Sequence, residues 1–177
     1  MNEVVVHGIP GKRRIEIGDI VSIDVGVRHG GFIGDTATTV MVGVVDPDVI
    51  RLVRTTEAAL KAGIEAAQVG NRLSDISHAI ETVRVAGRFS VVRDFVGHGI
   101  GRKMHEDPQV PNFGKPGRGP KLVAGMTLAL EPMVNLGRGD VEVMDDGWTV
   151  VSKDRKPSAH FEHTIAVRGE AAEVLTA

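Results

Sequence analysis

The sequence predicts an α+β fold whose sheet is largely antiparallel. Strand-like segments lie toward both ends of the 177-residue chain, and two helix-like segments fill one block in the middle. Segregated strands and helices of this kind are typical of that class. A hydrophobic share of 42% and a charged share of 25% suit a globular protein with a substantial core. We therefore expect one domain over residues 1–177, without an internal repeat or a linker.

The first predicted elements are two strands joined by a tight turn. Residues 18–27 alternate, with valine and isoleucine on one face and with Ser22 and Asp24 on the other. A second β-rich run, residues 36–45, follows the turn sequence RHGG. If the hairpin turns at His29-Gly30, Asp24 faces Asp35 directly.

Two helices are predicted next. Asp46 is the expected N-cap and Pro47 the first helical residue of a helix that Gly70 ends. A second helix is predicted over residues 74–86, with its stop at Gly87.

The rest of the chain is predicted to be mostly strand. Residues 89–96, 126–134 and 160–167 are β-rich, and residues 141–152 predict a hairpin that turns at Asp146-Gly147. Residues 107–120 are rich in proline, glycine and polar side chains, which predicts a loop.

Composition excludes several classes of function. A net charge of −2 without a basic cluster argues against nucleic-acid binding. The chain has no cysteine, so disulfides and thiolate metal sites are excluded. No secretory signal and no apolar run of membrane-spanning length is visible. We expect a cytoplasmic protein with no membrane partner.

Four acidic residues occupy unusual places in the predicted strands. Asp24 and Asp35 would have Cβ atoms roughly 5 Å apart if they faced each other, and like charges so placed repel. Glu131 ends an apolar run and Glu162 lies within another, although glutamate is depleted in strands. Each acid alone is compatible with a solvated surface position. The four together favour a shared proton or a bound cation.

A metal centre explains these acids together with one histidine. Four carboxylates carry a formal charge of −4, which two divalent cations would balance. Oxygen ligands with one nitrogen suit Mn²⁺, Fe²⁺, Co²⁺ or Zn²⁺. The sequence therefore predicts two divalent metal ions, roughly 3.5–4 Å apart, that activate a water molecule. The predicted ligands are Asp24, Asp35, His98, Glu131 and Glu162.

Glycines flank the predicted histidine ligand. We expect Gly97 and Gly99 to keep Cβ atoms away from a metal and a substrate that crowd His98. A phosphate-binding loop is a weaker interpretation, because GHGIG departs from the G-x-G-x-x-G pattern and no helix is predicted after it.

Several stretches, in order, resemble type I methionine aminopeptidases: NEVVVHGIP, IDVGV, GDTATT, GHGIGRKMHEDPQVPN, GMTLALEPM and DGWTVVSKDRKPSAHFEHTI. The match runs from Asn2 nearly to the C-terminus. The resemblance implies the pita-bread (creatinase/aminopeptidase) fold, a curved antiparallel sheet with helices on its outer face. It also implies the reaction, which is removal of the N-terminal methionine from nascent chains whose second residue is small.

The resemblance implies a role for each predicted metal ligand. Asp24 would chelate one metal, and Asp35 and Glu162 would bridge both. His98 and Glu131 would bind the other metal. A metal-activated hydroxide would then attack the scissile carbonyl.

The resemblance also implies further catalytic and substrate-binding residues. Glu131 would shuttle protons, and His105 would hydrogen-bond the substrate carbonyl. His7 would contact the scissile amide and assist the leaving amine. Met104 and Trp148 would line the pocket for the methionine side chain, although ordinary packing also explains Met104.

Three explanations remain for the part of the family pattern that precedes Asn2, and one further alternative concerns substrate specificity. Members of the family carry a segment before NEVVVHGIP that completes the fold and the methionine pocket, so the chain is expected to be an N-terminally truncated form with weak substrate binding. The start could be misassigned, another chain could supply the segment, or the protein could be a non-catalytic peptide binder. An Xaa-Pro-specific aminopeptidase or dipeptidase is a more distant alternative. The expected partners are nascent polypeptide N-termini and the ribosome, and the expected state is a monomer.

Overall fold

The computed structural model describes all residues from 1 to 177. It contains two helices, α1 (Pro47–Ala66) and α2 (Leu73–Ala86). The strands are β1 (Val4–Val6), β2 (Ile20–His29), β3 (Phe32–Met41), β4 (Ser90–Val91), β5 (Gly97–Gly99), β6 (Glu106–Val110), β7 (Thr127–Leu130), β8 (Met133–Asn135), β9 (Val141–Val143), β10 (Val150–Ser152), β11 (Ser158–His160), β12 (Glu162–Ala166) and β13 (Glu173–Val174).

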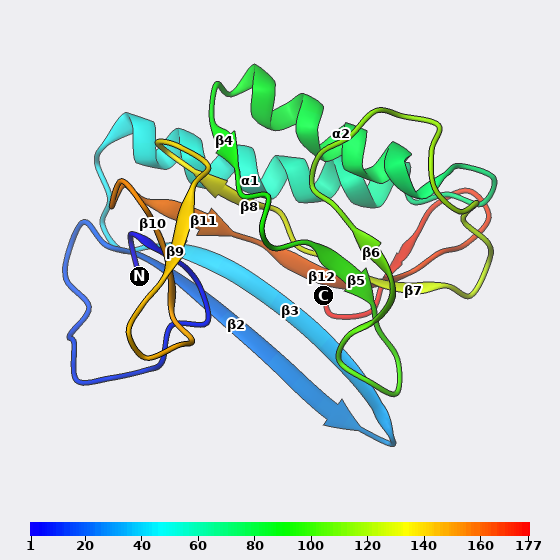
Figure 1. Ribbon diagram of the computed structural model, residues 1–177, viewed down its shortest axis with the longest axis horizontal. Coiled ribbons are helices and arrows are strands. Elements are labelled where there is room, and N and C mark those ends of the chain that lie inside the picture. Colours follow the sequence, from blue (N-terminus) through cyan, green and yellow to red (C-terminus); the bar gives the residue numbers. More distant parts are fainter.

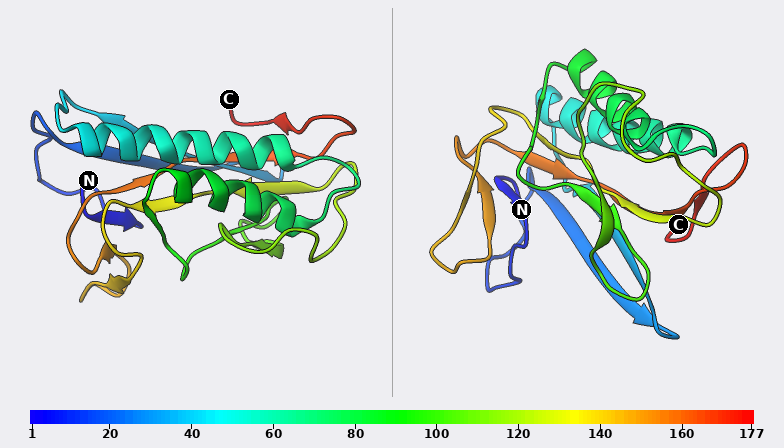
Figure 2. Two further views of the ribbon diagram at one scale, coloured as in Figure 1. Left: turned by 90° about the horizontal axis from the view of Figure 1, so that it is seen from above. Right: turned by 45° about the vertical axis from the view of Figure 1, so that its right-hand side comes forward.

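The strands form three antiparallel sheets. The largest has the order β2-β3-β12-β7-β5-β6, with β13 paired to β12. The orders of the two smaller sheets are β11-β8-β4 and β1-β10-β9. Both helices lie side by side over one side of the sheets, and the long β2–β3 hairpin projects away from them (Figure 1 and Figure 2). The predicted α+β class with antiparallel pairing is confirmed.

The helices begin where the sequence predicted. The Asp46 side chain accepts a hydrogen bond from the backbone N–H of Asp48 at 2.8 Å, and Pro47 is the first residue of α1. α1 ends at Ala66, before the predicted stop at Gly70. Its last carbonyl accepts a hydrogen bond from the side-chain amide of Asn71 at 2.9 Å, and this satisfies the helix end earlier than the glycine would.

The main core lies between the helices and the sheets. Leu52 of α1 and Ile76 of α2 are fully buried, as are Leu128, Leu130 and Ile165 of the central strands. Burial of each such side chain contributes about 1.5–3 kcal/mol. The helices thus pack against one face of strands β7 and β12 and fix their position. Neither helix has the length and apolar character needed to cross a membrane.

The first hairpin has a different register from the one predicted. It turns at Gly30-Gly31, with φ values of +58° and +85°, so Asp24 pairs with Ala37 and Asp35 pairs with Gly26. A two-residue hairpin turn of this type needs positive φ at both central residues, and glycine adopts it without strain. Asp24 and Asp35 are therefore diagonal neighbours on one face of the hairpin rather than direct partners.

Several other predicted boundaries are wrong. The strand predicted over residues 89–96 covers only β4, and β6 occupies part of the predicted loop at 107–120. β6 lies at an edge of its sheet, where Pro108 costs no ladder hydrogen bond. The helix over 74–86 and the hairpin around Asp146-Gly147 are as predicted, within a residue or two.

Two predicted strands are each interrupted, and the interruptions lie opposite each other. One break is at Glu131-Pro132 between β7 and β8, where proline has no N–H for a ladder. The other is at Phe161 between β11 and β12. His163 pairs with Leu130 before the breaks, and His160 pairs with Met133 after them. At this point both strands leave the large sheet and join the β11-β8-β4 sheet.

Candidate metal centre

Neighbouring strands bring the predicted acids together. Glu162 of β12 pairs with Ala37 of β3, which places it next to Asp35 on the same face of the sheet. Thr164 fixes this junction, because its hydroxyl accepts a hydrogen bond from the Asp35 N–H at 2.8 Å and donates to the Asp35 carbonyl at 2.9 Å. His98 lies on β5, and Glu131 follows β7 at the strand break.

These side chains form two groups that share Glu162. One group contains Asp35, His98 and Glu162, and the other contains Glu131, His160 and Glu162. Within each group the ligand atoms all lie within 4.8 Å of one another. Asp24 belongs to neither group. Its side chain is exposed, but partial desolvation and the nearby charge of Asp35 raise the pKa of its carboxyl to about 6.

His98 is oriented by its own strand. Its Nδ1 lies 2.9 Å from the carbonyl oxygen of Gly99, and only the ring nitrogen can donate in that pair. The proton is therefore on Nδ1, which leaves the Nε2 lone pair free, 3.5 Å from Glu131 Oε1. Burial lowers the pKa of His98, so the neutral ring is favoured. A buried neutral imidazole with a fixed tautomer is a suitable metal ligand.

The buried acids repel one another and have no basic partner. Burial, followed by the charges of Asp35 and Asp24, raises the pKa of Glu131 to about 8. Burial, followed by the charge of Glu131, raises the pKa of Glu162 to about 10. No lysine or arginine forms an ion pair with any of these acids.

The buried atoms fit a bound cation. Glu162 is only 2% exposed, and its Oε1 has no hydrogen-bond partner. Buried carboxylates are stable when they are paired or coordinate a metal. The donors are carboxylate oxygens with imidazole nitrogen, which suits first-row divalent metals.

The two auxiliary histidines predicted from the resemblance lie at the edge of this cluster. The His7 ring stacks on Trp148 with centroids 4.6 Å apart and meets the edge of Phe95 at 5.7 Å. The His105 ring lies 4.4 Å from that of His98. Burial, with the nearby charge of His105, lowers the pKa of His7.

Two cavities open beside the cluster. One, of about 780 Å³, is lined by Asp24, His7, Trp148 and His160, among others. The other, of about 570 Å³, is lined partly by His98 and His105. Met104 lines neither cavity. It packs over Gly26, where an added Cβ would collide with its terminal methyl group. A shared methionine pocket of Met104 and Trp148 therefore stays a prediction.

The glycines beside His98 serve a purpose different from the one predicted. A Cβ on Gly97 would lie against the carbonyl oxygen of Ala129, and one on Gly99 against the carbonyl of Asp107, in both cases closer than the 3.0 Å limit of real Cβ contacts. The missing Cβ atoms make room for the backbones of the neighbouring strands β7 and β6. They clear no space for metal or substrate.

Sequence reasoning missed two residues of the site. His160 is absent from the predicted ligand set, yet it joins the second ligand group. Its position two residues before Glu162 could have indicated a shared face, since side chains alternate along a strand. Phe95 contacts His7 and carried no signal beyond its place near the GHG motif.

Comparison with known proteins now decides the family. The model of metallopeptidase family M24 matches residues 1–169. The chain belongs to metallopeptidase family M24. Membership in this family, together with the buried Asp, His and Glu groups, indicates that the chain uses divalent metal.

Individual M24 relatives are similar over almost the whole chain. Methionine aminopeptidase of Clostridium perfringens is 57% identical, and methionine aminopeptidase 1 of Bacillus subtilis is 51% identical, over 99% of this chain and 71% of each relative. The crystal structure of methionine aminopeptidase from Thermotoga maritima superposes with a TM-score of 0.97 at 50% identity, covering 99% of this chain and 71% of that one. The predicted pita-bread fold is confirmed.

A more distant likeness concerns the fold alone. Prolidase from Pyrococcus furiosus superposes with a TM-score of 0.74 at 22% identity, covering 97% of this chain and 45% of that one. The Xaa-Pro-specific alternative gains no support from it.

Proposed function

We propose that this chain is a metal-dependent methionine aminopeptidase that removes the N-terminal methionine from polypeptides with a small second residue. Identity of 57% to a methionine aminopeptidase over 99% of the chain supports the assignment. The observation that carries the chemistry is the buried cluster of acids and imidazoles around Glu162, which has no basic partner. A peptide-binding protein without catalysis would have no need for such a cluster.

The proposed cofactor is a pair of divalent ions, either Mn²⁺, Fe²⁺, Co²⁺ or Zn²⁺. Asp24 would hold one ion, His98 and Glu131 the other, and Asp35 and Glu162 would lie between them. The two candidate groups that share Glu162 support this bridging role. Ions of this kind lower the pKa of water toward ~7 and polarise a carbonyl group.

For the remaining residues we propose the roles that the family resemblance implies. Glu131, whose Oε1 lies 3.5 Å from His98 Nε2, would take up and return a proton during the reaction. His105, which packs on His98, would donate a hydrogen bond to the substrate carbonyl. His7, held against Trp148, would contact the scissile amide. Trp148 and Met104 would contact the methionine side chain.

The proposed setting of the reaction rests on the assignment. The substrates would be N-termini of nascent chains, met at the ribosome in the cytoplasm. The chain would act as a monomer, and residues 1–177 would form a single catalytic domain.

The decisive experiment is metal-titrated release of methionine from Met-Ala-Ser. We expect release that depends on added Mn²⁺ or Co²⁺, and we expect it to exceed cleavage of an Xaa-Pro peptide. Faster cleavage of the Xaa-Pro peptide would favour the prolidase-like alternative. The absence of release at any metal concentration would favour the non-catalytic binder.

A pair of variants tests the bridging role. Asp35→Asn keeps the size of the side chain but removes its charge, so kcat/KM should fall by at least about 100-fold, in line with the loss of a group that supports a metal. Asp140→Asn, at an exposed acid outside the cluster, is the matched control and should behave like wild type. Equal activity of the two variants would contradict the role of Asp35.

A further inference from the structure

We propose that His160 is a metal ligand, so that the cluster holds its metal ions with two imidazoles rather than with His98 alone. His160 would supply a ring nitrogen to the ion held by Glu131 and Glu162. The inference rests on the proposed metal centre and adds a ligand that neither the sequence motifs nor the family resemblance assigns.

The first observation is an imidazole that is buried without partners. His160 is 1% exposed, and neither its Nδ1 nor its Nε2 has a hydrogen-bond partner. A neutral imidazole carries one donor and one acceptor, and buried polar groups in native proteins are almost always satisfied. If His160 served only to fill the core, both of its ring nitrogens would lack hydrogen-bond partners, and this would cost stability.

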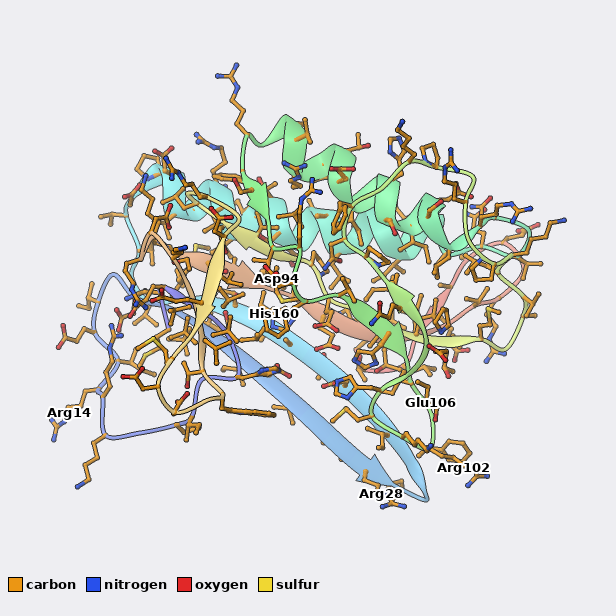
Figure 3. All side chains as sticks on the ribbon, in the orientation of Figure 1. Arg14, Arg28, Asp94, Arg102, Glu106 and His160 are labelled. Atoms are coloured by element: carbon orange, nitrogen blue, oxygen red, sulfur yellow. The ribbon has the colours of Figure 1, made fainter.

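The second observation is where this ring points. His160 Nε2 lies 3.8 Å from Glu131 Oε2, and His160, Glu131 and Glu162 have ligand atoms within 4.8 Å of one another. Glu162 Oε1 is also buried without a hydrogen-bond partner. Figure 3 shows His160 near the middle of the molecule, among the elements that supply the cluster. A cation in this group would satisfy the carboxylate oxygen and one ring nitrogen at once.

The backbone holds His160 in this position. Its N–H donates to the Thr39 hydroxyl at 3.0 Å, and its carbonyl accepts from the same hydroxyl at 2.7 Å. On its other side His160 pairs with Met133 of β8. A residue fixed from both sides keeps its side chain in place without help from the ring, as a pre-organised ligand requires.

A neighbouring histidine gives the contrast. His163, on β12, is half-buried, and its Nδ1 lies 3.1 Å from the Thr176 hydroxyl and 3.4 Å from that of Thr36. It belongs to neither ligand group. The two histidines are three residues apart, yet one has hydrogen-bond partners and the other faces carboxylates.

A second imidazole changes which metal the cluster prefers. Imidazole suits Zn²⁺, Co²⁺ and Fe²⁺, whereas an all-oxygen environment suits Mn²⁺. The ion next to Glu131 should therefore be held more tightly when it is Zn²⁺ than when it is Mn²⁺, and His160 should account for part of that difference.

The experiment counts imidazoles at the metal. Wild-type protein loaded with Zn²⁺ is examined by X-ray absorption spectroscopy, and Zn²⁺ affinity is measured by calorimetry. His160→Gln keeps a polar side chain of similar length but removes the ring, and His163→Gln is the matched control. We expect scattering from two imidazoles per protein chain in wild type and in His163→Gln. We expect scattering from one imidazole per chain in His160→Gln. We expect the Zn²⁺ dissociation constant to rise about 10–100-fold in His160→Gln alone.

Other outcomes overturn the inference. A folded His160→Gln variant with unchanged spectrum and affinity would show that His160 is not a ligand. If that variant fails to fold, the wild-type spectrum alone decides, and a single imidazole there would overturn the inference. Metal binding and methionine release with one imidazole would leave the proposed function intact. Failure to bind any divalent metal would overturn both.

Discussion

Glu162 is the residue through which the two ligand groups meet, and its environment explains why it was predictable. A glutamate within an apolar strand is rare, and a buried one needs a compensating partner. The same argument identified Glu131. It missed His160, because an imidazole in a strand is compatible with an ordinary core and gives no comparable signal. The two glutamates were thus predicted from their positions in the strand pattern, whereas His160 needed the structure.

Trp148 provides a prediction at the residue scale. Its ring stacks on His7 at 4.6 Å, and His7 has an unusual backbone conformation with φ +61°. Removing the indole in Trp148→Ala should free the His7 ring, so kcat/KM for Met-Ala-Ser should fall at least about 10-fold, since loss of about 1 Å in positioning costs up to about 100-fold. Steady-state kinetics measures this loss.

The control for Trp148 separates positioning from folding. Trp148 is 57% exposed, so its loss should leave the melting temperature nearly unchanged, and metal affinity should also stay constant. Trp148→Phe keeps an aromatic surface for His7 and should recover most of the activity. Full activity in Trp148→Ala would show that the stacking does not position His7.

Strand β5 provides the prediction at the scale of elements. Gly97→Ala would force a Cβ against the carbonyl of Ala129, which as backbone cannot move aside cheaply. We expect a loss of about 1–3 kcal/mol in unfolding free energy, the usual cost of overpacking, and weaker metal binding because His98 moves with its strand. Urea unfolding and metal titration measure both effects. Gly169→Ala, where an added Cβ meets no atom within 4 Å, is the matched control. Equal stability of the two variants would contradict the close approach of β5 and β7.

The elements were predictable in kind more than in detail. Helix starts followed from Asp46 and Pro47, whose chemistry is local. The hairpin register did not, because a choice between adjacent turn positions depends on which two residues adopt positive φ. The breaks at Pro132 and Phe161 depend on how two sheets meet, which a single strand pattern does not encode. These breaks carry Glu131, His160 and Glu162, so the least predictable part of the fold builds much of the site.

The whole molecule presents an apolar stripe on its projecting hairpin. Ile23, Val25 and Val27 of β2 are 50%, 45% and 56% exposed, although alternation of this kind is typical of a half-buried strand. The opposite, more polar face of β2 carries Asp24. Contiguous exposed apolar surface promotes dye binding and self-association.

Removal of this stripe is a direct test. The double variant Ile23→Thr, Val27→Thr keeps β-branched side chains and should lower the fluorescence of bound 1-anilinonaphthalene-8-sulfonate at least about two-fold, because apolar area is lost. Light scattering should show less association at high concentration. Metal affinity should not change, since these side chains lie on the face away from Asp24. A control double variant, Thr36→Ser, Thr38→Ser, alters the neighbouring strand without removing large apolar groups. Unchanged dye binding would show that the stripe is covered in solution.

The buried acids also make the stability of the whole molecule depend on pH and metal. The pKa values of Glu131 and Glu162 are raised from the ordinary 4.5 to about 8 and about 10 in the folded state. Between pH 4.5 and these values, these two carboxyl groups hold more protons in the folded chain than in the unfolded chain. The stability that these two carboxyl groups contribute to the metal-free protein is therefore lost as pH rises through this range. A bound divalent cation replaces the protons and should remove most of the decrease.

Melting temperatures in EDTA at pH 6 and pH 9.5, for wild type and for Glu162→Gln, measure this effect. Histidines and the amino terminus titrate in both proteins, so the difference between them isolates the Glu162 carboxyl. Between pH 6 and pH 9.5 the melting temperature of wild type should fall at least about 2–4 °C more than that of Glu162→Gln. This is the shift expected for a change of about 1 kcal/mol in unfolding free energy in a chain of this size. Added Mn²⁺ should restore the wild-type value at pH 9.5 and leave the variant nearly unaffected. The opposite outcome is a metal-free wild type whose melting temperature falls no more than that of Glu162→Gln between pH 6 and pH 9.5. The carboxyl of Glu162 would then be ionised in the folded state without a cation. The repulsion that underlies the metal centre would then be absent.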